Sequence, residues 1–116
     1  MLVLPIKKKW FDMIRSGEKK EEYREIKPYW TKRLNNELDR MLKSIIPSNV
    51  ERDLRKYPQW LMVKFRNGYR KDSPQIKCKC LLKYGQGKEE WGAEPNKEYY
   101  ILEILEILEV QNIGKE

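Results

Sequence analysis

Hydrophobic residues recur at helical spacing near the start of the chain, over residues 7–16. Trp10, Met13 and Ile14 fall on one face of a helix because they are three or four positions apart. Gly17 follows this stretch and can adopt the left-handed backbone conformation that commonly ends a helix. The pattern therefore predicts one amphipathic helix with an apolar face directed at a core.

A second helical pattern begins at Pro28, a residue that suits the first turn of a helix. Its apolar face consists of Trp30, Leu34, Leu38, Met41, Leu42 and Ile45. Pro47 ends the pattern, and capping-box spacing then predicts a short helix over residues 50–57. We therefore expect a helical insert near residues 28–57.

Short apolar runs and two-residue alternation predict strands in four segments. These are residues 2–6, 19–26, 60–66 and 75–84. In the last two, apolar side chains alternate with polar ones, which is typical of a half-buried sheet. Asn67-Gly68 marks the turn between them. The polar face of these strands carries Lys64, Arg66, Lys77, Lys79 and Lys83.

Residues 99–110 have two competing patterns. Glu103, Glu106 and Glu109 recur every third position, as on one side of a helix, whereas the tyrosine and isoleucine content favours a strand. The pattern alone leaves both structures open. A long strand with a bulge near Leu105-Glu106 would accommodate both periods.

The length of 116 residues suits one domain, and the mixture of segments predicts the α+β class. No apolar run approaches the roughly 20 residues of a membrane span. The first apolar residues precede the lysines, the reverse of a secretory signal, so we expect a cytoplasmic protein. Cys78 and Cys80 are expected to be reduced thiols, and without histidine a zinc site is not expected. No metal or other cofactor is predicted.

The charge is distributed unevenly along the chain. Residues 1–88 contain 23 Lys and Arg against 10 Asp and Glu, whereas residues 89–116 contain 2 against 8. An excess of cations attracts phosphates, so the basic strand face defined above is a candidate nucleic-acid surface. The alternative is an ordinary solvated surface.

One motif carries a family resemblance. Residues 16–24 contain Gly-x-Lys-x-x-Glu-x-Arg at Gly17, Lys19, Glu22 and Arg24. Together with the preceding helix and the segment starting at Tyr99, this motif resembles the signature of ASCH domains, named for activating signal cointegrator homology. The resemblance covers the chain from 1 to 116, but only this motif is specific.

The resemblance implies a PUA-like β-barrel with helices packed outside it, and a strand for residues 99–110. It also implies a ligand cleft beside the first helix and the second strand. Relatives bind RNA, recognise modified bases or, in a few cases, hydrolyse modified nucleosides or RNA. We therefore expect RNA or a nucleotide as partner.

The motif residues also suit a ligand site by their own chemistry. Lys19 and Arg24 can bind phosphate or carbonyl oxygens, and Glu22 can accept a hydrogen bond from an exocyclic amine. Strand alternation places Glu22 and Arg24 on one face and Lys19 and Tyr23 on the other. Lys19 joins the cleft only if the turn after Gly17 redirects it. The competing interpretation is a surface ion pair between Glu22 and Arg24, which contributes about 0–1 kcal/mol.

Several aromatic residues are candidates for base stacking. Trp60 starts a strand on its polar side and is a better candidate than Trp30, whose helical position favours the core. Trp91 lies in a loop and either plugs the end of the barrel or lines a site. Tyr23, inside the motif, completes the predicted ligand-binding set.

Three functions remain open from the sequence. The first is an RNA- or nucleotide-binding module. The second is a small hydrolase of a modified nucleoside or RNA, with Lys19 and Glu22 as candidate catalytic residues. ASCH amidohydrolases that act on acetylated cytidine use a threonine where this chain has Glu22, so we expect no such reaction. The third is a protein-interaction module, which predicts an exposed apolar helix face within residues 28–57.

Overall fold

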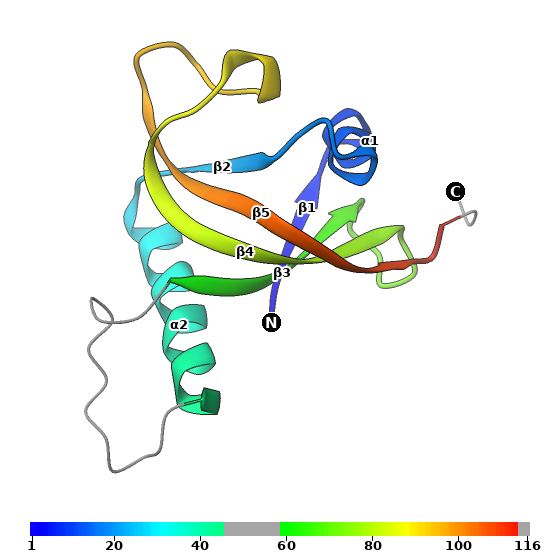
Figure 1. The fold of residues 1–116 in the computed structure, drawn as a ribbon, viewed down its shortest axis with the longest axis horizontal. Coiled ribbons are helices and arrows are strands. Elements are labelled where there is room, and N and C mark those ends of the chain that lie inside the picture. Colours follow the sequence, from blue (N-terminus) through cyan, green and yellow to red (C-terminus); the bar gives the residue numbers. More distant parts are fainter. Residues whose placement is uncertain (46–58, 114–116) are drawn as a thin grey trace.

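The computed structural model describes residues 1–45 and 59–113, in which five strands and two helices form an α+β fold (Figure 1). The strands are β1 (Leu2–Ile6), β2 (Glu21–Glu25), β3 (Trp60–Asn67), β4 (Gln75–Gln86) and β5 (Glu98–Gln111). The helices are α1 (Lys8–Ser16) and α2 (Pro28–Ile45), and a short 3-10 turn, η2, covers Glu89–Trp91. The predicted α+β class is confirmed. Pro47 and the helix predicted over 50–57 lie outside the described residues.

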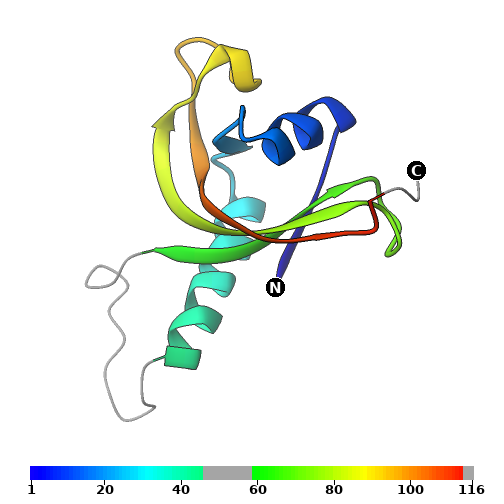
Figure 2. The same cartoon turned by 45° about the vertical axis from the view of Figure 1, so that its right-hand side comes forward.

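The five strands form one mixed sheet in the order β1-β3-β4-β5-β2. β1 pairs with β3 in parallel, and the other neighbours are antiparallel. The long strands β4 and β5 bend together across the molecule (Figures 1 and 2). Because β1 and β2 are opposite edges of the sheet, the described strands leave it open. The predicted closed barrel is therefore not confirmed.

Both helices contribute to one hydrophobic core on a single face of the sheet. Phe11 and Ile14 of α1 and Leu34 and Leu38 of α2 join this core with the inward residues of β3 and β4. Leu34, Leu38 and Leu42 of α2 are buried, whereas Trp30 and Met41 are partly buried and Tyr29 is 58% exposed. Among the described residues, no helix is both long enough and apolar enough to cross a membrane.

The segment with competing patterns is a strand, and β-bulges explain its three-residue period. The register between β4 and β5 shifts twice, so that Leu105 and Leu108 have no opposite residue on β4. The bulge predicted near Leu105-Glu106 is confirmed, and the second bulge at Leu108 is an additional finding. Each bulge adds one residue, which converts the usual two-residue alternation into a repeat of three.

The two bulges place the glutamates of β5 beside the lysines of β4. Glu106 lies opposite Lys79 and Glu109 opposite Lys77, while Glu103 lies opposite Leu81. These three glutamates therefore share the face that the sequence predicted to be basic. These carboxylates offset part of the positive charge of the five cations on this face.

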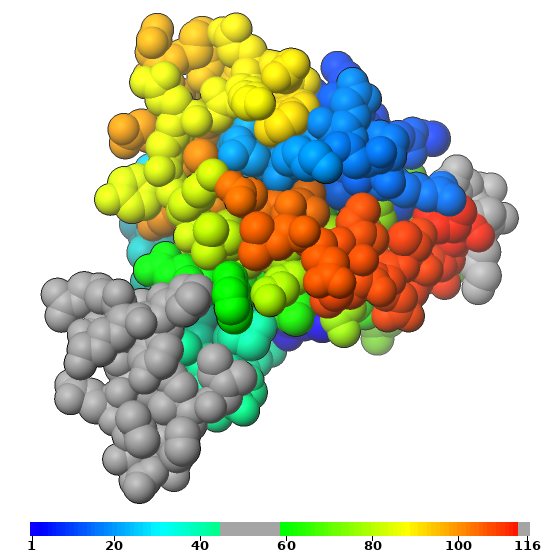
Figure 3. All heavy atoms as spheres, in the orientation of Figure 1, coloured from blue at the N-terminus to red at the C-terminus, as the bar shows by residue number. Residues whose placement is uncertain are grey.

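The second half of β5 is exposed along one side. β2 pairs with β5 only as far as Glu103, so the following residues have a strand neighbour on the β4 side alone. Figure 3 shows this part of β5, in orange to red, at the molecular surface near α1. The exposed apolar residues there are Leu105, Ile107, Leu108 and Val110.

The bulged strand can be tested with two leucines three positions apart. Leu102 is 0% exposed and Leu105 is 46% exposed. In a helix, two residues three positions apart would lie on the same side and have similar exposure. We expect Leu102→Ala to lower the free energy of unfolding by about 2–5 kcal/mol, since it opens a cavity in the core. Leu105→Ala should change it by no more than about 0.5 kcal/mol. Urea unfolding measures both, and equal losses would contradict the register.

Candidate ligand-binding site

The end of α1 directs Lys19 into the protein. Gly17 adopts a left-handed conformation (φ 85°), and its N–H donates to the carbonyl of Ile14. The Lys19 N–H then donates to the carbonyl of Met13 at 2.9 Å, which folds the chain back over the last turn of α1. Lys19 precedes the first residue of β2, so strand alternation does not fix its direction. This turn directs the Lys19 side chain toward Glu22 and the Trp91 carbonyl.

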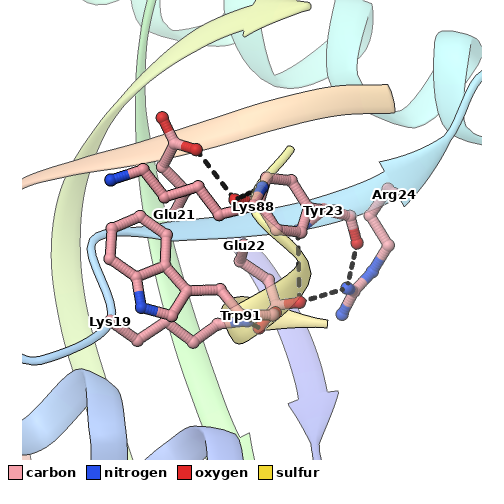
Figure 4. Close-up of polar contacts among 7 residues, drawn as sticks. All are labelled: Lys19, Glu21, Glu22, Tyr23, Arg24, Lys88 and Trp91. Atoms are coloured by element: carbon pink, nitrogen blue, oxygen red, sulfur yellow. Dashed lines mark hydrogen bonds and ion pairs between the residues drawn. The ribbon is translucent and has the colours of Figure 1, made fainter. Parts of the chain in front are cut away.

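The Lys19 side chain is almost completely buried, with 1% of the residue exposed. Its Nζ donates to the carbonyl of Trp91 at 2.5 Å and lies 3.5 Å from Glu22 Oε2 (Figure 4). The same ammonium is 4.4 Å from the centre of the Trp10 ring, within range of a cation–π interaction. Burial lowers the pKa of Lys19, and the charge of Glu22 opposes this shift.

Glu22 lies between Lys19 and Arg24. Its Oε1 accepts hydrogen bonds from the Tyr23 N–H at 3.1 Å and from Arg24 Nη1 at 3.2 Å. The side chain is 8% exposed, and Oε2 has no hydrogen-bond partner among the described residues. Arg24 Nη1 also donates to the Tyr23 carbonyl at 2.7 Å. One carboxylate is thus held by two cations, Lys19 at Oε2 and Arg24 at Oε1.

These residues adjoin a cavity of about 700 Å³. Glu22, Tyr23 and Arg24 line it together with three indole rings, and the lining also includes the residues around the starts of both helices. The indoles belong to Trp10, Trp30 and Trp91. Arg24 places its guanidinium carbon 5.3 Å from the centre of the Trp30 ring, which pre-positions a planar cation beside the cavity. Lys19 supports Glu22 from behind and Gly17 caps α1, so neither residue lines the cavity.

Tyr23 attaches the η2 loop to β2. Its hydroxyl donates to Glu21 Oε1 at 2.8 Å and accepts the Lys88 N–H at 2.9 Å. The loop approaches so closely that a Cβ on Gly87 would lie 2.6 Å from the Tyr23 ring. Desolvation raises the pKa of Tyr23, so its hydroxyl stays a donor at neutral pH. The loop attached in this way carries Trp91, one wall of the cavity.

Trp60 and the lysine face lie apart from this cavity. Trp60 is 38% exposed, and the Lys79 ammonium is 3.9 Å from the centre of its ring. Lys83 forms ion pairs with Glu103 and Glu21, and Arg66 donates to Gln75. The face of Lys64, Arg66, Lys77, Lys79 and Lys83 is thus opposed by glutamates of β5 and β2. Nucleic-acid binding by this face stays a prediction.

Sequence reasoning missed Trp10 and Trp30 as cavity residues because helical spacing assigned both to the core. Trp30 does contact the main core, yet it also lines the cavity. Trp10 follows three lysines at the start of α1, where a large ring lies at the margin of the core. The position of each tryptophan at a helix N-terminus was the signal available in the sequence.

The described residues contain no group of three or more His, Cys, Asp or Glu side chains arranged to hold a metal ion. The arrangement instead offers aromatic surfaces, a carboxylate acceptor and cationic donors. Comparisons with protein-family models, with curated proteins and with solved structures found no match. The chemistry of the cavity therefore carries the functional argument.

The buried ion pair can be tested by replacing Lys19 with a side chain of similar length. Lys19→Met should lower the free energy of unfolding by about 3–5 kcal/mol, because Glu22 loses a buried cation. Lys20→Met, at an exposed position next to it, should change the value by no more than about 0.5 kcal/mol. Adding Glu22→Gln to Lys19→Met should restore part of the loss. Chemical denaturation measures all three, and similar values for the two lysine variants would disprove the pairing.

Proposed function

We propose that this protein is an RNA- or nucleotide-binding module that takes a base into the cavity beside Glu22 and Arg24. The observation that carries the proposal is a buried carboxylate, held between two cations, at a cavity lined by three indoles. Ligand sites of proteins commonly occupy about 300–1,000 Å³ and combine apolar walls with a few polar groups. The volume and lining of this cavity match that description.

The aromatic walls favour a flat ligand. Trp10, Trp30 and Trp91 come from α1, α2 and the η2 loop, so rings from three separate elements meet at one cavity. Stacking of one base on an aromatic side chain contributes about 1–3 kcal/mol. Arg24 adds a planar guanidinium, which stacks on bases and also donates hydrogen bonds. A nucleobase uses all of these surfaces.

The polar groups favour a nucleobase whose edge carries a hydrogen-bond donor. Glu22 lies between the cations of Lys19 and Arg24, at 3.5 Å and 3.2 Å. An ionised carboxylate only accepts hydrogen bonds, so it complements an exocyclic amine. The contacts of Lys19 with Glu22 and Trp91 hold that carboxylate in place.

We also propose that the chain belongs to the ASCH branch of PUA-like proteins and acts inside the cell. In the Gly-x-Lys-x-x-Glu-x-Arg motif, Glu22 contacts both Lys19 and Arg24. Glu22 and Arg24 line the cavity, and Gly17 forms the turn that directs Lys19 toward Glu22. This division of roles supports the family resemblance.

A hydrolase is the second candidate, and one observation favours it. The pKa of Lys19 is lowered, and a lysine of that kind beside a carboxylate is suited to proton transfer. Against it, the ammonium donates to the Trp91 carbonyl and does not line the cavity. Lys19 is therefore used to build the site, and we favour binding without turnover.

Base stacking can be measured with two tryptophan variants. Trp30→Ala should weaken binding of single-stranded RNA or of a nucleotide by about 5- to 150-fold, the equivalent of one stacked base. Trp60→Ala removes the same side chain outside the cavity and should leave affinity unchanged within about twofold. Fluorescence anisotropy with labelled RNA and calorimetry with nucleotides give the dissociation constants. If the Trp60 variant alone loses affinity, binding takes place on the lysine face instead.

Turnover is tested separately with the wild-type chain and Glu22→Gln. We expect neither to hydrolyse acetylcytidine or RNA, with or without Mg²⁺, because the threonine hydroxyl of the amidohydrolases is replaced here by a carboxylate. Chromatography of the reaction products is the measurement. Hydrolysis by the wild-type chain that disappears in Glu22→Gln would establish the enzyme and overturn the binding-module proposal.

A further inference from the structure

Trp30 connects the cavity to a second group of side chains on the surface of α2. Tyr29 and Arg33 form this group, and neither residue lines the cavity. The ring centres of Tyr29 and Trp30 are 4.9 Å apart, and the guanidinium carbon of Arg33 lies 5.3 Å from the centre of the Trp30 ring. One indole therefore contacts this group and also lines the cavity.

The two arginines that contact Trp30 have different partners. Arg24 donates to Glu22 Oε1, whereas Arg33 has no carboxylate partner among the residues that the structure describes. Arg33 Nη1 donates to the Tyr29 hydroxyl at 3.2 Å, and the guanidinium carbon lies 5.6 Å from the centre of the Tyr29 ring. A guanidinium has five N–H donors, so most of those of Arg33 are available to a ligand.

Pairing along the helix does not explain the position of Arg33. An arginine on a helix can pair with a carboxylate four positions later, which here belongs to Glu37. Glu37 instead pairs with Arg40 Nη1 at 3.3 Å. Arg33 also lies in the second turn of α2, beyond the first N–H groups of the helix. A planar cation is thus held against two aromatic rings without a counter-ion among the described residues.

Tyr29 presents an aromatic ring to solvent beside this cation. The residue is 58% exposed, whereas Trp30 is partly buried. The planes of the two rings are 78° apart, so bases lying on both rings would not stack on each other. Proteins commonly bind single-stranded RNA in this way, with splayed bases that stack on aromatic rings or on arginine.

We infer that Tyr29 and Arg33 form a second nucleotide subsite, and that the ligand is two adjacent nucleotides of one RNA strand. One base enters the cavity, the neighbouring base stacks on Tyr29, and Arg33 donates to the phosphate that joins them. An arginine suits a phosphate because its N–H groups match the phosphate oxygens in charge and geometry. This inference rests on the proposed function and assigns its ligand to RNA instead of a free nucleotide.

Calorimetry with ligands of different length tests the second subsite. The ligands are the four common ribonucleoside 5′-monophosphates, the sixteen dinucleotides built from them, and matched dinucleotides in which one sugar carries no base. We expect at least one dinucleotide to bind about 5- to 150-fold more tightly than either of its mononucleotides, the equivalent of one stacked base. Removal of the second base should reduce this gain.

Variants of the subsite assign the gain to its residues. Tyr29→Ala and Arg33→Ala should each reduce the dinucleotide gain by at least about fivefold, while mononucleotide affinity stays within about twofold of the wild type. Tyr29→Phe retains the ring and should retain most of the gain. Lys43→Ala removes an exposed cation of the same helix, paired with Asp39, and should preserve the gain.

Salt dependence separates a phosphate contact from a structural role of Arg33. Each phosphate neutralised on a single strand contributes about 0.7 to the slope of log affinity against log salt concentration. Arg33→Ala should reduce the dinucleotide slope by about that amount, whereas Tyr29→Ala should leave it unchanged. An Arg33→Ala protein with reduced affinity and the wild-type slope would overturn the phosphate contact.

The outcomes distinguish this inference from the proposed function. If dinucleotides bind no more tightly than mononucleotides, or if the gain persists in both Tyr29→Ala and Arg33→Ala, the second subsite is overturned and base binding in the cavity stands. Dinucleotide binding that is lost in Tyr29→Ala but unchanged in Glu22→Gln would retain the subsite and overturn base recognition in the cavity. No binding of any of these ligands would overturn both.

Discussion

The burial of the Lys19 ammonium beside Glu22 is the interaction on which the candidate site depends. A cation removed from water is stable only with nearby negative charge and hydrogen-bond acceptors. Lys19 obtains these from the carboxylate of Glu22 and the carbonyl of Trp91. Three segments are thereby linked, namely the end of α1, strand β2 and the η2 turn. This link positions the walls that α1, β2 and the η2 turn contribute to the cavity.

A second set of contacts keeps the cavity open beside this pair. Arg24 binds the other oxygen of Glu22 and lies beside Trp30, while Tyr23 holds the η2 loop through its hydroxyl. The same five-residue strand, β2, thus supplies the acceptor, the planar cation and the loop anchor. The lysine face of β3 and β4 is less suited to phosphate, because the bulges of β5 bring glutamates next to it.

The sequence predicted most of the secondary structure because period and capping residues act locally. Gly17 ended the first helix, Pro28 began the second, and the alternation in β3 and β4 identified strands. The three-residue period of β5 could not be interpreted without its partner strand, because a bulge is defined by the pairing between two neighbouring strands. The pairing of β5 with β4 was therefore needed to establish the predicted bulge and to find the second one at Leu108.

The site was predictable only in part for a related reason. The motif identified Lys19, Glu22 and Arg24, but the turn that buries Lys19 depends on its backbone bond to Met13. The roles of Trp10 and Trp30 depend on where two helix starts meet in space, which helical spacing does not encode. Charge counts along the chain likewise did not reveal that glutamates of the C-terminal strand lie beside the lysines of the basic face.

The four tryptophans provide the most direct measurement of the central claim, that a base binds in the cavity beside Glu22. Three of their indoles line the cavity, and the fourth, Trp60, lies outside it. A two-dimensional ¹H–¹⁵N spectrum resolves each indole N–H during titration with nucleoside monophosphates or a short single-stranded RNA. The account predicts saturable shifts of the Trp10, Trp30 and Trp91 signals with the Trp60 signal unchanged. Shifts confined to Trp60, or no shifts at any indole at saturating ligand, would contradict it.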